Sequence, residues 1–218
     1  IPDFHSLEKR YENFKKAVHK NPVNRVEEAK EEIAFVNAHI DNMLVIPELE
    51  KKGSLPLRIT HNDTKLNNVL FDNNDKAVCV IDLDTVMPGL SLYDFGDTVR
   101  TAANTAEEDE PDIDKIRFSI PVFKAFSEGF LENTISFLAP PEIELLPLSA
   151  QYMTFIMGLR FLTDYISGDK YFAIKYTSHN LVRCKAQFRL MEDMIRHYRE
   201  SLDIIFTTVK KLQKQSGK

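Results

Sequence analysis

Apolar side chains recur at helical spacing through the first fifty residues of the chain. The first set follows Ser6, whose hydroxyl suits a helix N-cap, at steps of four, three and four positions: Leu7, Tyr11, Phe14 and Val18. A second amphipathic stretch carries Val26, Ile33, Val36, Ile40 and Met43. Gly53 and Pro56 then interrupt the pattern. We therefore expect helices up to about residue 50 and a break over residues 51–58.

The pattern changes to that of β-strands between residues 59 and 86. Two short apolar runs, residues 69–71 and 77–81, flank the turn-forming segment Asp72–Lys76. This arrangement predicts a β-hairpin. It is the one strong β signal that we find in the chain.

Helical periodicity returns from about residue 113 onward. A long apolar-rich stretch covers residues 143–166, with Pro147 near its start. A more regular stripe, predicting one long final helix, consists of Leu181, Cys184, Phe188, Met191, Ile195, Tyr198, Leu202, Ile205, Val209 and Leu212. Such a stripe suits either a coiled-coil seam in a dimer or a helix packed on its own core, and we favour the second interpretation.

These patterns predict a mainly α protein with a short β-hairpin. We find no internal repeat and no low-complexity linker, so we expect a single domain over residues 1–218. Within it, residues 59–86 carry the hairpin and residues 113–213 form a helical part.

Composition excludes several classes of function. The 7 glycines are never spaced as G-x-G-x-x-G or G-x-x-x-x-G-K, which excludes a self-contained Rossmann or P-loop phosphate cradle. The net charge of −5 gives no basic footprint for nucleic acid or an anionic membrane, and no apolar run is long enough to span a bilayer. With 2 cysteines there is no disulfide framework. We expect a cytoplasmic protein with neither nucleic acid nor membrane as a partner.

Polar residues that suit magnesium lie at one end of the predicted hairpin. If its turn centres near residues 74–75, Asn68 pairs with Ile81 or Asp82, and side chains directly opposite have Cβ atoms ~5 Å apart. The amide oxygen of Asn68 and the carboxylate of Asp82 are hard ligands of the kind that Mg²⁺ prefers. Asp63 and Lys65 precede the first strand, near the same end.

The same segments carry a family resemblance. The run H-N-D-T-K-L-N-N-V-L, followed by V-C-V-I-D, resembles the catalytic loop and metal-binding strand end of the protein-kinase-like phosphotransferases, in particular the aminoglycoside and choline phosphotransferase group. The words I-D-L-D-T-V-M-P-G and L-Y-D-F-G-D are similar to those of the N-acetylhexosamine 1-kinases and their bacterial relatives. The segments I-P-D-F-H and D-K-Y-F-A-I-K-Y fit the same group, so the resemblance spans most of the chain.

The resemblance implies roles for four residues around the hairpin. Asp63 corresponds to the carboxylate that accepts the proton of the attacking hydroxyl. Asn68 and Asp82 correspond to the Mg²⁺ ligands that bridge the phosphates of ATP. Lys65 stands where its charge offsets the negative charge on the transferring phosphoryl group.

Further residues are implied as supports. His61 corresponds to a residue that braces the loop, and Asp94 to a helix-start aspartate that holds the loop by hydrogen bonds. Asp84 would share a strand face with Asp82 if the strand continued, where it would support the metal or the substrate. Arg100, one turn after Asp97, is expected to form an ordinary ion pair.

Substrate contacts are harder to assign. Arg160 lies in an apolar neighbourhood, where it either pairs with Asp164 at i+4 or faces the sugar or its developing phosphate. Tyr171 is either a sugar contact or a core or rim tyrosine. The acidic run at residues 107–110 is typical of a solvated loop, and the alternative is that it attracts a cationic acceptor.

The expected function is an ATP- and Mg²⁺-dependent kinase acting on the anomeric hydroxyl of an N-acetylhexosamine. The alternatives are another hydroxyl acceptor, such as an aminoglycoside, choline-like compound or amino alcohol, and a non-catalytic kinase-like binding module. The resemblance implies that the chain is the helical C-terminal lobe of this fold, without the β-rich N-terminal lobe that covers the ATP phosphates. We therefore expect negligible kinase activity from residues 1–218 alone.

Overall fold

The computed structural model describes residues 1–216 and is built mainly of helices, which confirms the expected fold class. The last two residues of the expected 1–218 domain lie outside the described residues. The α-helices, in chain order, are α1 (Leu7–Lys20), α2 (Lys30–Met43), α3 (Val45–Lys51), α4 (Ser91–Ala102), α5 (Ile120–Thr134), α6 (Pro140–Glu144), α7 (Leu146–Ser167), α8 (His179–Arg196) and α9 (Tyr198–Ser216). No helix among residues 1–216 combines the length and the apolar character needed to cross a membrane.

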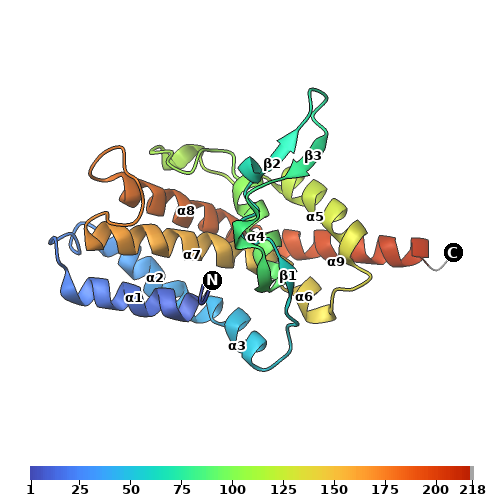
Figure 1. Ribbon diagram of the computed structural model, residues 1–218, viewed down its shortest axis with the longest axis horizontal. Coiled ribbons are helices and arrows are strands. Elements are labelled where there is room, and N and C mark those ends of the chain that lie inside the picture. Colours follow the sequence, from blue (N-terminus) through green and yellow to red (C-terminus); the bar gives the residue numbers. More distant parts are fainter. Residues whose placement is uncertain (217–218) are drawn as a thin grey trace.

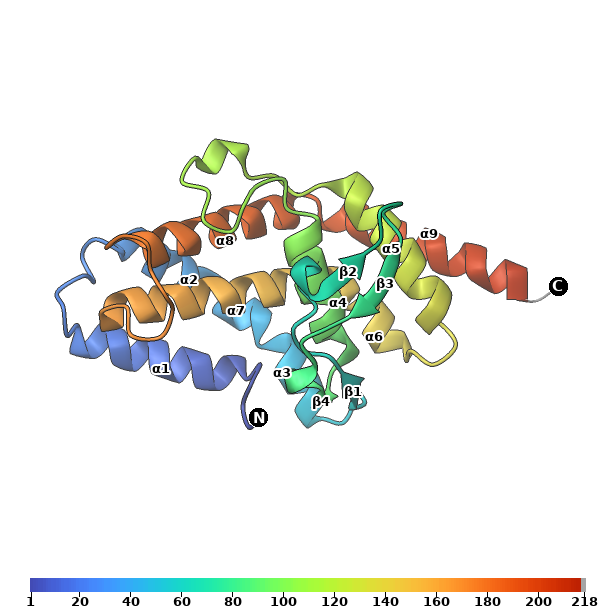
Figure 2. The same cartoon turned by 45° about the horizontal axis from the view of Figure 1, so that its top comes forward.

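Helix α7 forms the centre of the molecule. It packs against α1, α2, α4 and α8, and Figures 1 and 2 show it running between α1 and α8. Most of its side chains are buried because neighbours cover it on several sides. Pro147 lies in its first turn, where a missing N–H costs nothing. At the crossing with α4, a Cβ on Gly96 would collide with the backbone carbonyl of Ser149.

The amino-terminal helices follow the sequence prediction with one shift. Ser6 caps α1, its Oγ accepting a hydrogen bond from the Lys9 amide at 3.3 Å. The second helix begins at Lys30, so Val26 lies in the preceding turn rather than in the helix. Gly53 adopts φ 73° in the predicted break, a left-handed conformation that costs glycine little.

The prediction of one long final helix was wrong. The helix is interrupted at His197 (φ −93°, ψ 9°), which separates α8 from α9. Helix α8 packs mainly on α7 and α9 mainly on α5. Ile195 is 40% exposed although it lies on the apolar stripe, whereas Ile205 is fully buried. The stripe is therefore buried in two separate pieces, and the first lies against the chain's own core.

Four short strands form two antiparallel ribbons within the described residues. β2 (Val69–Phe71) pairs with β3 (Ala77–Val80), as predicted, and Figure 1 shows this hairpin projecting from the helices. β1 (Arg58–Thr60) pairs with β4 (Met87–Gly89). The sequence did not predict this ribbon, because its two strands lie far apart along the chain and no turn signal joins them directly. The second ribbon brings the two ends of the 61–86 segment together beside α4.

Candidate functional site

The loop of residues 61–68 is anchored on the first turn of α4. The two carboxylate oxygens of Asp94 accept hydrogen bonds from the backbone amides of His61 (2.8 Å) and Asn62 (2.7 Å). Thr64 Oγ1 donates to the backbone carbonyl of Asp94 at 2.7 Å, and Thr98 Oγ1 donates to that of Thr64 at 3.1 Å. Burial raises the pKa of Asp94, and the amide hydrogen bonds partly oppose this shift. Asp94 thus has the bonding expected of a residue that holds the loop.

Asn62 fixes the same loop to the segments that lead into and out of the β1–β4 ribbon. It adopts a left-handed conformation (φ 65°) and is buried. Its side-chain amide donates to the carbonyls of Thr60 (3.1 Å) and Thr85 (3.0 Å), and so connects β1 to the segment before β4. Gly89 packs so closely here that a Cβ would lie 2.8 Å from the Asn62 side-chain oxygen. Sequence reasoning missed this contact, because its partners come from segments about 25 residues apart.

His61 braces the loop against the end of the hairpin. Its Nε2–H donates to the Ile81 carbonyl at 3.0 Å, and its own carbonyl accepts from Thr85 Oγ1 at 2.7 Å. These bonds are those of a positioning residue, in keeping with the supporting role that the resemblance implies.

Three polar side chains converge where the loop meets β2. Lys65 Nζ lies 2.8 Å from Asp63 Oδ2, and Asn68 Nδ2 donates to the same oxygen at 3.0 Å and to the Asp63 carbonyl at 2.8 Å. Asp63 Oδ1 has no hydrogen-bond partner within residues 1–216. The hydrogen bond to Asp63 raises the pKa of Lys65, and the charges of Asp82 and Asp97 act in the same direction. Asp63 therefore presents one free carboxylate oxygen beside a cation.

The hairpin register brings Asp82 to the same end as Asn68. Paired residues in the regular part are Val69 with Val80 and Leu70 with Cys79, whose numbers sum to 149 as predicted. The Ile81 amide donates to the Asn68 carbonyl at 2.9 Å, which extends this register and places Asp82 one residue further. Asp82 has φ 62°, so the strand ends there and the chain turns.

The strand does not continue from Asp82 to Asp84, so the expected shared strand face does not form. Residues Leu83–Thr85 form a short 3₁₀ turn rather than extended strand, because the left-handed Asp82 redirects the backbone. Asp84 is exposed and does not share a strand face with Asp82.

Two oxygen groups at this end suit a divalent cation. The amide nitrogen of Asn68 is engaged by Asp63, which leaves its Oδ1 without a hydrogen bond from any described residue. The carboxylate of Asp82 is likewise free of hydrogen bonds from residues 1–216. Mg²⁺ commonly takes one or two protein oxygens and completes its shell with water and phosphate. The donor set therefore fits Mg²⁺, whereas no group of three or more His, Cys, Asp or Glu residues in the described chain could hold a metal by itself.

Arg160 and Tyr171 lie together, away from the hairpin end. The expected alternative, an ion pair of Arg160 with Asp164, does not form. The Asp164 carboxylate instead accepts hydrogen bonds from the backbone amides of residues 170–172 and from the Asn180 side chain. Arg160 Nη2 donates to the Tyr171 hydroxyl at 3.4 Å, and the exposed Tyr171 ring is 5.6 Å from the guanidinium carbon. Tyr171 is thus a rim residue of a pocket that Arg160 also lines.

A cavity of about 620 Å³ opens beside Lys65. Its walls come from the 61–68 loop, the end of α4 and the acidic segment, and include Arg100. Arg100 is buried and pairs with Asp97 at 2.9 Å, as expected, and also with Glu108 at 3.0 Å.

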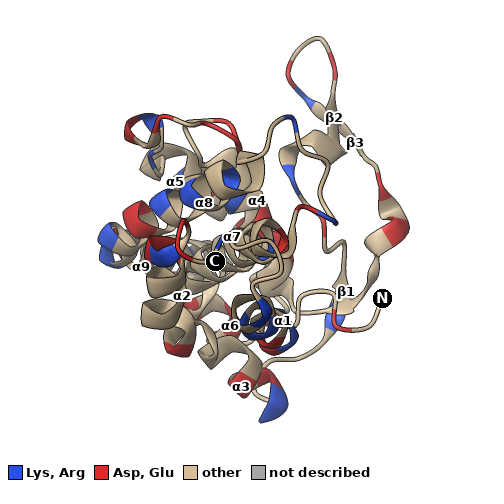
Figure 3. Cartoon of the chain, turned by 90° about the vertical axis from the view of Figure 1, so that its left-hand side faces the viewer, with Lys and Arg blue, Asp and Glu red and all other residues tan. Residues whose placement is uncertain are grey.

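The acidic segment is more ordered by ion pairs than a solvated loop would be. Besides Glu108, Asp109 pairs with Lys175 at 2.6 Å and accepts from the buried His179 at 3.0 Å. The Lys175 hydrogen bond, followed by that of His179, lowers the pKa of Asp109 to about 2. Figure 3 shows acidic and basic residues interspersed in this segment between α4 and α5. The prediction of a plain solvated loop was therefore wrong for these two residues.

The arrangement combines the elements that phosphoryl transfer needs. A carboxylate oxygen is free to accept a proton, a lysine lies beside it, and two hard oxygen groups stand at the adjacent strand end. A family model described as the phosphotransferase enzyme family (APH) matches residues 3–125, which include this loop, both ribbons and α4. Because this match covers more than half of the chain, the protein belongs to the phosphotransferase enzyme family.

Proposed function

We propose that this protein is an ATP-dependent kinase of a small hydroxyl compound, and that its acceptor is the anomeric hydroxyl of an N-acetylhexosamine. The observation that carries the phosphoryl-transfer part is the contact set of Asp63, Lys65 and Asn68 beside the Asp82 strand end. The acceptor part rests on the resemblance of the sequence words around Asp82 and Asp94 to the N-acetylhexosamine 1-kinases.

Each residue of the site has a role in this proposal. Asp63 Oδ1 accepts the proton of the attacking hydroxyl and orients it, while Asn68 holds the Asp63 carboxylate in place. Lys65 offsets negative charge on the transferring group. When bound, Mg²⁺ held by Asn68 and Asp82 neutralises charge on the ATP phosphates.

The assignments of Arg160, Tyr171 and Asp84 as acceptor contacts remain proposals. Arg160 and Tyr171 place a cation beside a hydroxyl at the rim of a pocket, and both groups suit hydrogen bonds with a sugar. Asp84 lies in the exposed turn after Asp82, two residues from the proposed metal ligand.

A second acceptor class is favoured by one observation. The cavity beside Lys65 is lined by Glu107, Glu108 and Glu110, and two of these already pair with cations of the chain. The remaining Glu107 gives the wall a negative charge that would attract a cationic acceptor, such as an aminoglycoside or amino alcohol.

The acceptor is tested by a panel. The protein in its full natural length is given ATP and Mg²⁺, and ADP release is measured with N-acetylglucosamine, N-acetylgalactosamine, choline and an aminoglycoside. Turnover of an N-acetylhexosamine supports the proposal. Turnover of only choline or the aminoglycoside would show that the acceptor is a cationic compound and not a sugar. If none of the acceptors stimulates ADP release, the result favours a binding module.

A further inference from the structure

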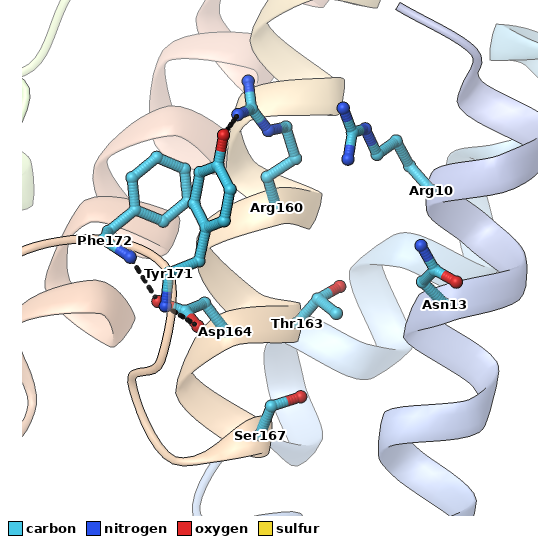
Figure 4. A pocket seen from close by; sticks show the side chains of 8 residues that line it. All are labelled: Arg10, Asn13, Arg160, Thr163, Asp164, Ser167, Tyr171 and Phe172. Atoms are coloured by element: carbon cyan, nitrogen blue, oxygen red, sulfur yellow. Dashed lines mark hydrogen bonds between the residues drawn. The ribbon is translucent and has the colours of Figure 1, made fainter. Parts of the chain in front are cut away.

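A second pocket lies between α1, α7 and the loop that follows α7. It has a volume of about 150 Å³, which is enough for a small ion with several waters. Figure 4 shows the side chains of Arg10 and Arg160 reaching to the same end of it, with Asn13 and Ser167 further along. The pocket is separate from the cavity beside Lys65, with which it shares no lining residue.

Its two arginines lack a counter-ion among the described residues. Arg10 donates a single hydrogen bond, from Nη2 to the Phe4 carbonyl at 3.1 Å, and its Nε is buried without a partner. Arg160 donates to the weak acceptor Met157 Sδ at 3.3 Å and to the Tyr171 hydroxyl at 3.4 Å. Neither guanidinium forms an ion pair with a carboxylate of residues 1–216.

The one carboxylate in the pocket wall does not neutralise them. The Asp164 carboxylate accepts hydrogen bonds from three backbone amides of the loop and from the Asn180 side chain of α8, so these groups use its lone pairs. Burial, and after it the charge of Arg10, lowers the pKa of Arg160. The two cations therefore share a half-buried space at a cost in repulsion that a bound anion would remove.

Other groups of the pocket suit the remaining oxygens of such an anion. The Tyr171 hydroxyl accepts from Arg160, which leaves its own proton free to donate. The side chains of Asn13 and Ser167 add neutral polar groups. Arginine forks match the planar geometry of carboxylate and phosphate groups.

We infer that this pocket between α1 and α7 is a binding site for a small oxyanion, a phosphate or carboxylate group, held by Arg10 and Arg160. The inference deepens the proposed function, on which its sugar-phosphate arm rests, because Arg160 and Tyr171 are also the proposed acceptor contacts. A neutral hydroxyl acceptor by itself has no charge that would neutralise two arginines. The oxyanion is either free in solution or part of a phosphorylated sugar.

The test is calorimetric titration of the full-length protein at low ionic strength, without ATP. The ligands are inorganic phosphate, acetate, N-acetylglucosamine 1-phosphate and neutral N-acetylglucosamine. We expect saturable binding of phosphate that Arg10→Gln weakens at least ~10-fold, the effect of losing a charge-assisted hydrogen bond. Arg10→Lys keeps the charge but loses the forked donor geometry of arginine, so its affinity for phosphate should lie between those of the wild type and Arg10→Gln. Arg199→Gln makes the same change in charge at an exposed position of α9 and should leave binding unchanged.

The ligand arms distinguish the two sources of the anion. Equal affinity for inorganic phosphate and the sugar phosphate indicates a free ion, and much tighter binding of the sugar phosphate indicates a phosphorylated sugar. A thermal melt of each variant without ligand verifies folding, and phosphate should raise the Tm of the wild type but not of Arg10→Gln. The absence of saturable binding by any anion, or equal weakening by Arg10→Gln and Arg199→Gln, would overturn the inference. Neither outcome depends on which acceptor is phosphorylated.

Discussion

The Nε2–H of His5 donates a 3.0 Å hydrogen bond to the backbone carbonyl of Asn62, the residue directly before Asp63. The bond crosses from the segment before α1 to the 61–68 loop, and the His5 carbonyl in turn accepts from the Tyr152 hydroxyl of α7 at 3.0 Å. His5 therefore connects the loop to the central helix. In the sequence, His5 stands out only as part of the segment I-P-D-F-H of the family resemblance, which gives it no role.

The burial of His5 predicts a pH dependence of stability. Burial lowers the pKa of His5 from 6.5 to about 4, with Arg160 and Arg10 acting in the same direction and the Asn62 bond and Asp97 opposing them. The unfolded chain binds a proton near pH 6.5 and the folded chain does not. The contribution of His5 to the free energy of unfolding is therefore complete above pH 6.5. It should fall by about 1.4 kcal/mol per pH unit as the pH drops from 6.5 toward 4.

Urea unfolding between pH 7 and 4.5 measures this slope. His5→Gln keeps an N–H donor and removes the titration, so it should flatten the slope. His19→Gln, at an exposed position of α1, is the control and should keep the wild-type slope. An unchanged slope in His5→Gln would show that other groups cause the acid sensitivity.

Asp63→Asn should lower kcat by at least ~10³-fold, because the amide cannot accept the proton of the hydroxyl. The measurement is steady-state ADP release with the acceptor identified by the panel. Asp75→Asn, the same change at the exposed hairpin turn, should leave kcat unchanged, since asparagine also tolerates the left-handed φ of 58° found there. A loss in Asp63→Asn of less than ~10-fold would contradict the role as general base.

Asp82→Asn should raise the Mg²⁺ concentration needed for half-maximal activity, because an amide oxygen holds the cation more weakly than a carboxylate. A magnesium titration of initial rates measures the shift, again with Asp75→Asn as control. Asp84→Asn in the same titration separates its two proposed roles: a raised Mg²⁺ requirement indicates support of the metal, and a raised KM for the acceptor alone indicates a substrate contact. Wild-type Mg²⁺ dependence in Asp82→Asn would remove Asp82 from the metal site.

Gly96→Ala should destabilise the protein by ~1–3 kcal/mol, the usual cost of overpacking, because the new methyl group meets the Ser149 backbone. Gly129→Ala, by contrast, is expected to increase the stability of the protein. Its Cβ would meet no atom within 4 Å in the middle of α5, so the better helix propensity of alanine should stabilise by about 0.5–1 kcal/mol. Denaturant unfolding of both variants measures the difference, and equal effects would contradict the close α4–α7 crossing.

The local elements of the site could be predicted from the sequence because their signals are local. The turn residues 72–76 and the apolar runs on either side determine the hairpin and its register, and so the alignment of Asn68 with Ile81. The left-handed turn at Asp82 could not be predicted in this way. No spacing rule marks it, and it invalidated the expected position of Asp84.

The sequence by itself determined the helical class, the hairpin and the identity of the polar residues at its end, since each follows from spacing over a few residues. The tertiary structure decided which distant groups satisfy one another. Asp94 accepts hydrogen bonds from the amides of residues 61 and 62, and Asp109 accepts one from His179. Asp164 accepts its hydrogen bonds from the loop after α7 and forms no ion pair with Arg160. Such choices depend on how helices pack, because a buried polar group takes the partner that packing brings within hydrogen-bond distance, whatever its separation along the chain.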